Sequence, residues 1–234
     1  MTPEILANGL AWYVVFLFSI TVHEAAHAFA AMKMGDDTAY NGGQVTLNPV
    51  PHVRREPFGT VIVPILSYFF AGWMMGWASA PYNPHWALQY PKRSAIMSLA
   101  GPASNLLLVF GAAIIIRLGV EFGFFVPPDK ISFTHLTEAV DGGMGSSVAT
   151  MLSILFSLNL LLFAFNLIPV PPLDGSGALP LLMSEQVGQK YMSLLHRSGF
   201  AIFGIFLAWQ LFTYVYPPIH LAAINLLYPG MEYR

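Results

Sequence analysis

A long apolar stretch opens the chain: residues 5–34 read ILANGLAWYVVFLFSITVHEAAHAFAAMKM. A membrane-spanning helix needs about 20 consecutive apolar residues, and this stretch exceeds that length. Between Ile5 and Met32 the only formally charged side chain is Glu24, which lies within the run His23-Glu24-Ala25-Ala26-His27. The stretch therefore predicts a transmembrane helix that carries ionisable residues at bilayer depth.

The composition of the whole chain also indicates an integral membrane protein. Of the 234 residues, 56% are hydrophobic and 9% are charged, and the mean hydropathy is +0.60. Soluble domains average about 25% charged residues. The net charge of −2 excludes a basic surface for nucleic acid. Because the chain has no cysteine, disulfides, thiolate catalysis and cysteine-ligated zinc or iron–sulfur sites are excluded as well.

Four further apolar stretches and a short sixth one follow the first; they are 58–77, 94–120, 146–168, 198–216 and 219–228. They predict an all-α polytopic membrane protein with about five to six transmembrane helices. We expect residues 1–234 to form a single domain, whose parts are the helix at 5–34, a cytoplasmic and re-entrant region at 35–93, and helical segments at 94–120, 146–178 and 197–234.

The basic residues predict the topology. Cytoplasmic loops are enriched in lysine and arginine, so we expect the N-terminus outside and seven basic residues on the cytoplasmic side: Lys33, Arg54, Arg55, Lys92, Arg93, Lys190 and Arg197. The stretch 58–77 then has basic residues at both ends on the same side, and its three glycines and one proline disfavour a uniform helix. We therefore predict that it enters the membrane and returns, which requires protein or water around its backbone.

The histidines of the first stretch have the spacing of metal ligands. On a helix, His23, Glu24 and His27 fall within an arc of roughly 100°, so the two imidazoles can bind one ion while Glu24 lies beside it. Imidazole and carboxylate ligands without thiolate suit zinc with an open position for water, and the run matches HExxH. The alternative is two packing histidines and a chance glutamate. A buried carboxylate costs about 2.5–3.5 kcal/mol, which argues against that alternative.

Two histidines do not complete a zinc site, and spacing does not choose the third ligand among His52, Glu56, Asp36, Asp37, Asp174 and His196. Asp174 has the most suggestive surroundings, because the three prolines before it forbid regular helix at the end of a span. Broken backbone near membrane depth is expected to line a site. The alternative is that Asp174 caps a helix over residues 175–183. The sequence weighs these two hypotheses equally.

With these motifs the chain resembles the site-2 protease family of intramembrane zinc metalloproteases. The resemblance rests on HEAAH at 23–27 and on the pattern N-x-x-P-x-x-x-L-D-G at 166–175. It is reinforced by Gly-Pro-Ala-Ser-Asn at 101–105 and by Leu-Asn-Pro at 47–49, and it extends from residue 10 to about 178. PDZ and CBS domains are missing from the sequence, as in a short form of the family.

The resemblance implies a role for each matching position. His23, His27 and Asp174 would bind zinc, and Glu24 would be the general base. Asn105 would hold the substrate carbonyl or its oxyanion. Two further residues would contact the substrate: Asn166, which could also orient the Asp174 loop, and the looser match His52.

The same resemblance bears on the region between the HExxH helix and the GPxxN helix. There the family is cytoplasmic or re-entrant and often supplies strands that pair with an extended substrate. The β-branched runs at 44–47 and 61–63 could form such strands. The predicted region is therefore partly β.

The function that follows is zinc-dependent intramembrane endoproteolysis by metal-activated water. The expected substrate is a transmembrane segment of a single-pass protein, cleaved in the lipid bilayer of a prokaryotic inner membrane with the active site toward the cytoplasm. We expect one Zn²⁺ per chain and no nucleic-acid partner, and a homo-oligomer is compatible with the sequence.

The main alternative is a transporter or channel for metal ions or protons. It would need ionisable residues along a route through several helices, whereas 146–168 has none and 94–120 has only Arg117. A catalytically silent relative is a second alternative. The complete set of histidines, glutamate and aspartate argues against it, because an inactive copy has no need for a buried carboxylate.

Overall fold

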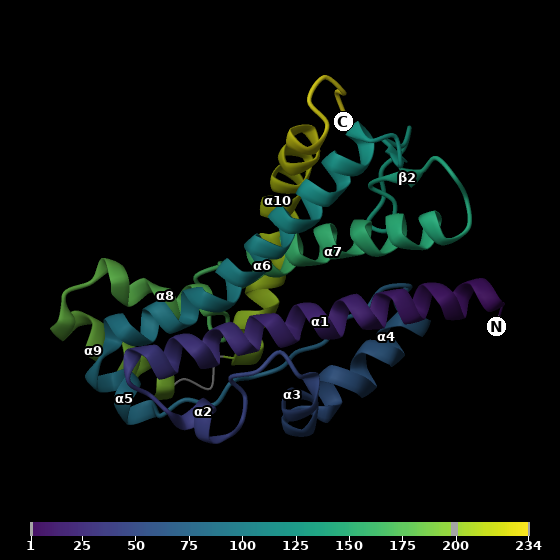
Figure 1. Cartoon of the computed structure of the whole chain (residues 1–234). Coiled ribbons are helices and arrows are strands. Elements are labelled where there is room, and N and C mark those ends of the chain that lie inside the picture. Colours follow the sequence, from purple (N-terminus) through teal and green to yellow (C-terminus); the bar gives the residue numbers. More distant parts are fainter. Residues whose placement is uncertain (1, 198–200, 234) are drawn as a thin grey trace.

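The computed structural model describes residues 2–197 and 201–233, without the side chains of residues 3–4, 196–197 and 201–202. Within these limits the chain is mostly helical, and its sheet has two short strands (Figure 1). The elements are α1 (Pro3–Met34), α2 (Thr38–Asn41), α3 (Pro49–Arg55), the π-helical turn η1 (Phe58–Ile62), α4 (Val63–Ala71), α5 (Pro84–Gln89), α6 (Pro91–Glu121), β1 (Phe125–Val126), β2 (Glu138–Ala139), α7 (Met144–Asn166), α8 (Asp174–Ala178), the 3₁₀ turn η2 (Leu179–Leu182), α9 (Glu185–Arg197) and α10 (Ala201–Leu227).

Capping residues define the ends of α1. The Thr2 hydroxyl accepts a hydrogen bond from the Ile5 amide at 3.4 Å, and Pro3 occupies the first helical position, where its missing N–H is not needed. Gly35 ends the helix in the left-handed conformation, with φ 98°. The 32 residues between these caps make a helix of about 48 Å, longer than the hydrocarbon core of about 30 Å.

Three long helices, α1, α6 and α7, pack against one another and form the body of the molecule (Figure 1). At the start of α6, Arg93 Nη1 donates to the carbonyl of Met34 at the end of α1, at 3.3 Å, so α6 begins where α1 stops. α7 then returns beside α1, and its Leu158 shares a core cluster with Phe16. α7 therefore runs toward the end of the bundle where α1 ends and α6 begins, and it stops near the level of His23.

Of the described helices, three are long and apolar enough to cross a membrane: Ile5–Met34, Pro91–Glu121 and Met144–Asn166. A shorter apolar helical stretch is Phe58–Ala71. The prediction of a mostly helical integral membrane protein is confirmed. The count of five to six spans stays a prediction.

Residues 35–93 follow α1 to its beginning and come back (Figure 1). The hydroxyl of Tyr68, in α4, donates to the carbonyl of Ile5 at 2.9 Å, so α4 lies beside the first turns of α1. An extended segment, residues 72–83, then leads to α5, where Trp86 shares a core cluster with Ala31 near the end of α1.

The predicted β-strands within this region are wrong, because residues 35–93 contain no strand. Residues 61–63 belong to the continuous helical stretch of η1 and α4, and residues 44–47 form an irregular loop. That loop is fixed at its start by a 2.9 Å bond from the Gln44 amide to the Ala39 carbonyl. β-branched residues favour a strand only where a neighbouring strand can pair with it, and this region offers helices instead.

The loop between α6 and α7 is tied to the other end of the bundle. β1 and β2 pair antiparallel, with Phe125 opposite Ala139. The buried hydroxyl of Ser153, in α7, accepts the amide of Leu136 at 2.9 Å, and the hydroxyl of Tyr228 donates to the carbonyl of Leu136 at 2.8 Å. These bonds join the loop to both α7 and α10.

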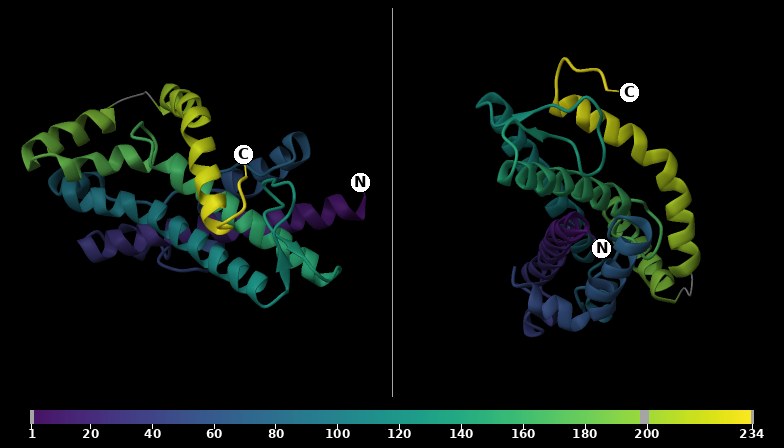
Figure 2. Two further views of the ribbon diagram at one scale, coloured as in Figure 1. Left: turned by 90° about the horizontal axis from the view of Figure 1, so that it is seen from above. Right: turned by 90° about the vertical axis from the view of Figure 1, so that its right-hand side faces the viewer.

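The C-terminal part differs in detail from the predicted segments. The helix predicted over 146–178 ends at Asn166 and is followed by an irregular turn before α8, as the prolines predicted. The stretches 198–216 and 219–228, predicted separately, belong within the described residues to one helix, α10, which continues through Pro217 and Pro218. Aromatic stacking bridges the prolines, since Tyr216 stacks on Phe212 before them and on His220 after them. Figure 2 shows α10 on the side of α7 that faces away from α1.

Candidate metal centre

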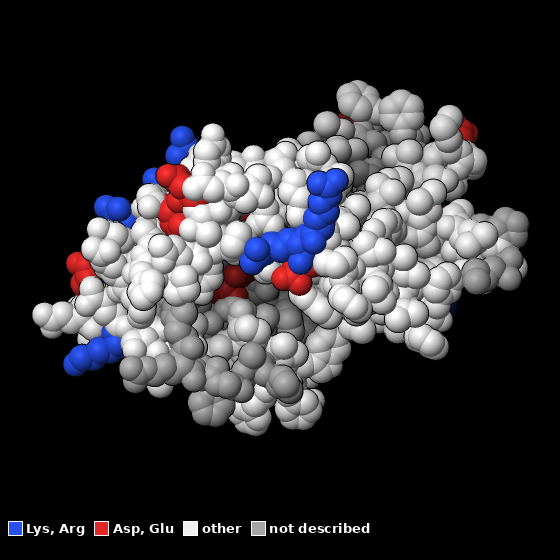
Figure 3. Space-filling model, turned by 90° about the horizontal axis from the view of Figure 1, so that it is seen from below, with Lys and Arg blue, Asp and Glu red and all other residues white. Residues whose placement is uncertain are grey.

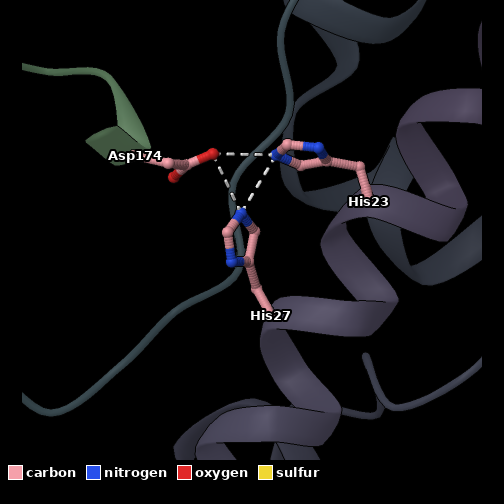
Figure 4. A group of neighbouring side chains, drawn as sticks. All are labelled: His23, His27 and Asp174. Atoms are coloured by element: carbon pink, nitrogen blue, oxygen red, sulfur yellow. Dashed lines mark hydrogen bonds and ion pairs between the residues drawn. The ribbon is translucent and has the colours of Figure 1, made fainter. Parts of the chain in front are cut away.

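Two histidines of α1 and one aspartate of α8 converge on one point (Figure 4). His23 Nε2 lies 3.0 Å from His27 Nε2. Asp174 Oδ2 lies 3.2 Å from the first of these nitrogens and 3.3 Å from the second. The three atoms thus form a nearly equilateral triangle. In the described part of the chain this is the one group of three or more histidine and acidic side chains arranged to hold a metal ion.

The dimensions and the chemistry of this triangle fit zinc. Zinc bonds to nitrogen and oxygen of about 2.0–2.1 Å give a tetrahedron whose edges are about 3.3–3.4 Å, close to the observed separations. Asp174 Oδ2 is buried and accepts no hydrogen bond within the described residues. A buried carboxylate oxygen without a donor is costly unless a cation compensates it. The donor set of two imidazoles and one carboxylate leaves a fourth position open.

The outer nitrogens of both imidazoles contact acceptors on α6. His23 Nδ1 lies 2.5 Å from Asn105 Oδ1, and His27 Nδ1 lies 2.7 Å from the carbonyl of Met97. Both acceptors require a proton on Nδ1, which leaves the lone pair of Nε2 free for a metal. Such partners orient metal-binding histidines in many proteins. The Met97 carbonyl could not be recognised from the sequence, because any residue supplies this group.

Gly101 of α6 faces the two metal-binding nitrogens. A Cβ atom at this position would collide with Nε2 of His27 and would lie 2.6 Å from Nε2 of His23. The glycine therefore leaves the space that a metal and its ligands need. Gly101 was not among the site residues predicted from the sequence. Its place in the motif at 101–105, one helical turn before Asn105, was the available signal.

Glu24 is buried beside the triangle, with 6% of its surface exposed. It belongs to α1, next to His23 and three residues before His27, so it projects from a neighbouring part of the same helix face. Its carboxylate is not part of the metal-binding group of His23, His27 and Asp174. This is the arrangement expected of a base that acts on water without binding the metal.

Asp174 is held by a close contact between α8 and the turn before it. The N-cap of α8 is Leu173, and Asp174 is the first helical residue, so the alternative in which Asp174 caps the helix is wrong. A Cβ at Gly175 would collide with the carbonyl of Leu167, which explains the glycine that follows the aspartate. The chain between Leu167 and Leu173 includes a cis peptide bond between Pro171 and Pro172.

The other residues considered as a third ligand have different partners. Asp36 accepts hydrogen bonds from Thr38 and Asn83, Glu56 accepts one from Ser79, and Asp37 is exposed. The side chain of His196 lies outside the described residues. Spacing could not make this choice, because it depends on how the helices pack.

Two of the residues predicted to bind substrate do not contact the triangle. His52, in α3, is buried, and its Nε2 lies 3.1 Å from the carbonyl of Thr46, so it fixes the loop at 44–47. Asn166 ends α7 and donates to the carbonyl of Leu162 at 3.0 Å. Their predicted roles toward substrate remain predictions.

Comparisons with known proteins agree with this geometry. The model of peptidase family M50 matches residues 11–211. The chain is 33% identical over 207 residues to YwhC of Bacillus subtilis (strain 168), a match that covers 88% of this chain and 84% of that protein. No solved structure matches the chain.

Two further relatives are both named Rip2. The protein of Mycolicibacterium smegmatis is 27% identical over 187 residues, which are 80% of this chain and 62% of that protein. The protein of Mycobacterium tuberculosis (strain ATCC 35801 / TMC 107 / Erdman) is 30% identical over 166 residues, or 70% and 54% of the two chains. The match thus spans less than two thirds of either Rip2 protein. All three relatives are named as zinc metalloproteases, and the chain belongs to peptidase family M50, the site-2 protease family, as a zinc metalloendopeptidase.

Proposed function

We propose that this zinc metalloendopeptidase cleaves a transmembrane segment of a single-pass membrane protein, within the bilayer and near its cytoplasmic side. The observation that carries the proposal is the position of the metal-binding triangle within a membrane-spanning helix. His23 lies 20 residues after Pro3 and 11 residues before Met34. At 1.5 Å per residue these separations are about 30 Å and about 16 Å, so the site lies at bilayer depth, closer to the end of α1.

The charge distribution supports a cytoplasmic location for that end. Exposed basic residues lie at the end of α1 and the beginning of α6, namely Lys33, Lys92 and Arg93, and two more, Arg54 and Arg55, end α3. Figure 3 shows the charged side chains of this face gathered over the half that holds α2, α3 and α9, while the opposite half is largely uncharged. Lysine and arginine are enriched on the cytoplasmic side of membrane proteins. The course of residues 58–77, out along α1 and back, supports the proposal that this segment is re-entrant.

The chemistry divides among the residues of the site. His23, His27 and Asp174 would hold the zinc ion, which supplies a Lewis acid that polarises a carbonyl and acidifies water. Glu24 accepts the proton of the attacking water and delivers it to the leaving amine. Asn105 and the Met97 carbonyl orient the two imidazoles. With its Oδ1 against His23, Asn105 is better suited to this orienting role than to the oxyanion role implied by the family resemblance.

Substrate binding is best supported at the extended segment 72–83. Near its start, a Cβ at Gly76 would lie 2.6 Å from Phe16 of α1, and near its end the Asn83 amide donates to Asp36. The segment therefore passes the level of Glu24. The backbone amides of residues 78–80 make no hydrogen bond within the described part of the chain. A substrate helix must unwind before cleavage, and pairing with this extended segment would hold it open.

The decisive experiment uses Glu24→Gln in purified protein reconstituted with a helical single-pass reporter. Loss of the base should abolish cleavage while leaving the zinc content near that of the wild type, because Glu24 is not a ligand. His23→Ala should lose both, and Glu185→Gln, at an exposed position of α9, should lose neither. Cleavage by Glu24→Gln at the wild-type rate would exclude the mechanism. A wild type that cuts only soluble peptides would exclude the proposed substrate.

A further inference from the structure

A buried asparagine of α7, Asn159, is linked to the metal centre through Asn105. Asn159 has no exposed surface and lies in the middle of a helix that carries no ionisable residue. Its Oδ1 accepts a hydrogen bond from Asn105 Nδ2 at 2.7 Å. Its Nδ2 donates to Ser19 Oγ and to the carbonyl of Leu155, each at 2.8 Å. Asn105 in turn contacts His23, so a chain of side chains joins all three long helices.

The direction of this chain is fixed at its far end. A backbone carbonyl only accepts hydrogen bonds, so the group of Asn159 that faces Leu155 must be the amide nitrogen. Its oxygen then faces Asn105, which must present its own nitrogen to Asn159 and its oxygen to His23. His23 Nδ1 must therefore carry a proton, and its Nε2 lone pair points toward the metal position.

A single hydrogen bond holds His27 in the same tautomer, with the proton on Nδ1. His27 Nδ1 contacts the carbonyl of Met97 directly, at 2.7 Å. Both imidazoles are therefore oriented by a main-chain carbonyl, one directly and the other through two amides. No backbone carbonyl of α7 contacts His23 among the described residues, and the two asparagines span that gap.

We propose that Asn159 is a positioning residue that sets the tautomer and the orientation of His23 through Asn105. The inference rests on the proposed function of the metal centre and adds a residue outside the family motifs. A purely structural role would need no particular direction of the hydrogen bonds. Here both N–H groups and the oxygen of the amide are used, and the oxygen lies on the side that leads to the histidine.

The first test compares Asn159→Leu with Ser157→Ala. Leucine keeps the branched shape and the number of heavy side-chain atoms of asparagine but removes the anchor, so Asn105 can turn its nitrogen toward His23. Ser157 is a matched control, because it is buried in the same helix and its hydroxyl has no hydrogen-bond partner within the described residues. In a chelator competition with zinc, we expect the affinity of Asn159→Leu to fall about tenfold, the lower end of the effects seen for outer partners of metal ligands. The control should stay within about twofold.

The second test observes the imidazole itself. In protein labelled with ¹⁵N-histidine, the resonance of the His23 Nδ1 proton, assigned by its loss in His23→Ala, should shift in Asn159→Leu and not in Ser157→Ala. A merely structural role would not move it, so unchanged affinity and resonance, or equal changes in the control, would overturn the inference. The spectrum is also recorded without zinc. A wild type that binds no zinc would refute the proposed function, while the resonance would still decide the role of Asn159.

Discussion

Gly101 of α6 occupies the place where a side chain would collide with Nε2 of His27. Because of this contact, α6 borders a metal site whose histidines belong to α1. The contact also links a motif in the third apolar stretch to the HExxH motif in the first.

Gly101→Ala should therefore remove zinc. The added methyl group occupies the space of the metal and its ligands, so we expect zinc affinity to fall at least about 100-fold, or about 2.8 kcal/mol, with loss of cleavage. Zinc content and chelator competition measure the effect. Gly111→Ala is the matched control, because it lies in the same helix and a Cβ there meets nothing within 4 Å. Equal zinc affinity in the two variants would contradict the role of Gly101.

Asp174→Asn tests the third ligand. The amide keeps the shape of the carboxylate but loses its charge, so zinc should bind at least about 10- to 100-fold more weakly, because the loss of an outer partner of a ligand alone has an effect of that size. Metal analysis after dialysis against a chelator reports the loss. Asp37→Asn, at an exposed aspartate that the sequence also allowed as a ligand, should retain zinc. Retention by both variants would remove Asp174 from the site.

Removal of zinc should lower the thermal stability. A ligand that binds only the folded state adds about 2.7 kcal/mol when its free concentration is 100 times the dissociation constant. A chelator should therefore reduce the unfolding temperature of the wild type in detergent, while His27→Ala should unfold at the same temperature with and without it. A chelator effect of equal size in His27→Ala would mean that the stabilising metal is bound elsewhere.

Ala80→Pro should weaken substrate binding without affecting the metal. Proline removes the backbone N–H of residue 80, which makes no hydrogen bond within the described residues, and so removes a donor for an extended substrate. We expect a higher KM for a helical reporter and unchanged zinc content. Ala80→Ser keeps the N–H and should resemble the wild type. An unchanged KM in the proline variant would argue against pairing at this segment.

The topology can be tested with single cysteines, because the chain has none of its own. Asp37→Cys, just beyond α1, and Asp141→Cys, just before α7, change exposed residues at opposite ends of the bundle. A thiol reagent that cannot cross membranes should label Cys at 141 in intact cells and Cys at 37 only after permeabilisation. The reverse pattern would place the metal centre on the outer side.

Features that depend only on nearby residues could be predicted from the sequence. The i, i+4 spacing of His23 and His27 placed both imidazoles on one face of a helix, since that geometry is set by the helix alone. The long apolar stretches predicted the helices α1, α6 and α7 within a few residues at most ends. The irregular backbone before Asp174 was predicted from its prolines, because proline acts on its own backbone, whereas the helix expected over 146–178 ends at Asn166.

What depended on packing between helices could not be predicted. Asp174 is one of several acidic residues that spacing allowed, and its approach to the histidines results from the return of α7 beside α1. The steric role of Gly101 follows from the contact between α1 and α6. The strand at 61–63 was predicted from β-branched residues, whose preference depends on their surroundings. Asn159 offered a signal that was overlooked, since a polar amide within an apolar span usually has a hydrogen-bonding partner on another helix.

The three groups of the metal-binding triangle are made at very different times during translation. Both histidines belong to the first helix, whereas the aspartate follows after α6 and α7 have been synthesised. A ribosome-bound chain that has inserted α1 but not yet α6 therefore has two of the three ligands and lacks the helix that carries Gly101. Peptide hydrolysis has to await the synthesis of α8, so the set of ligands is complete only after all three long helices have been made.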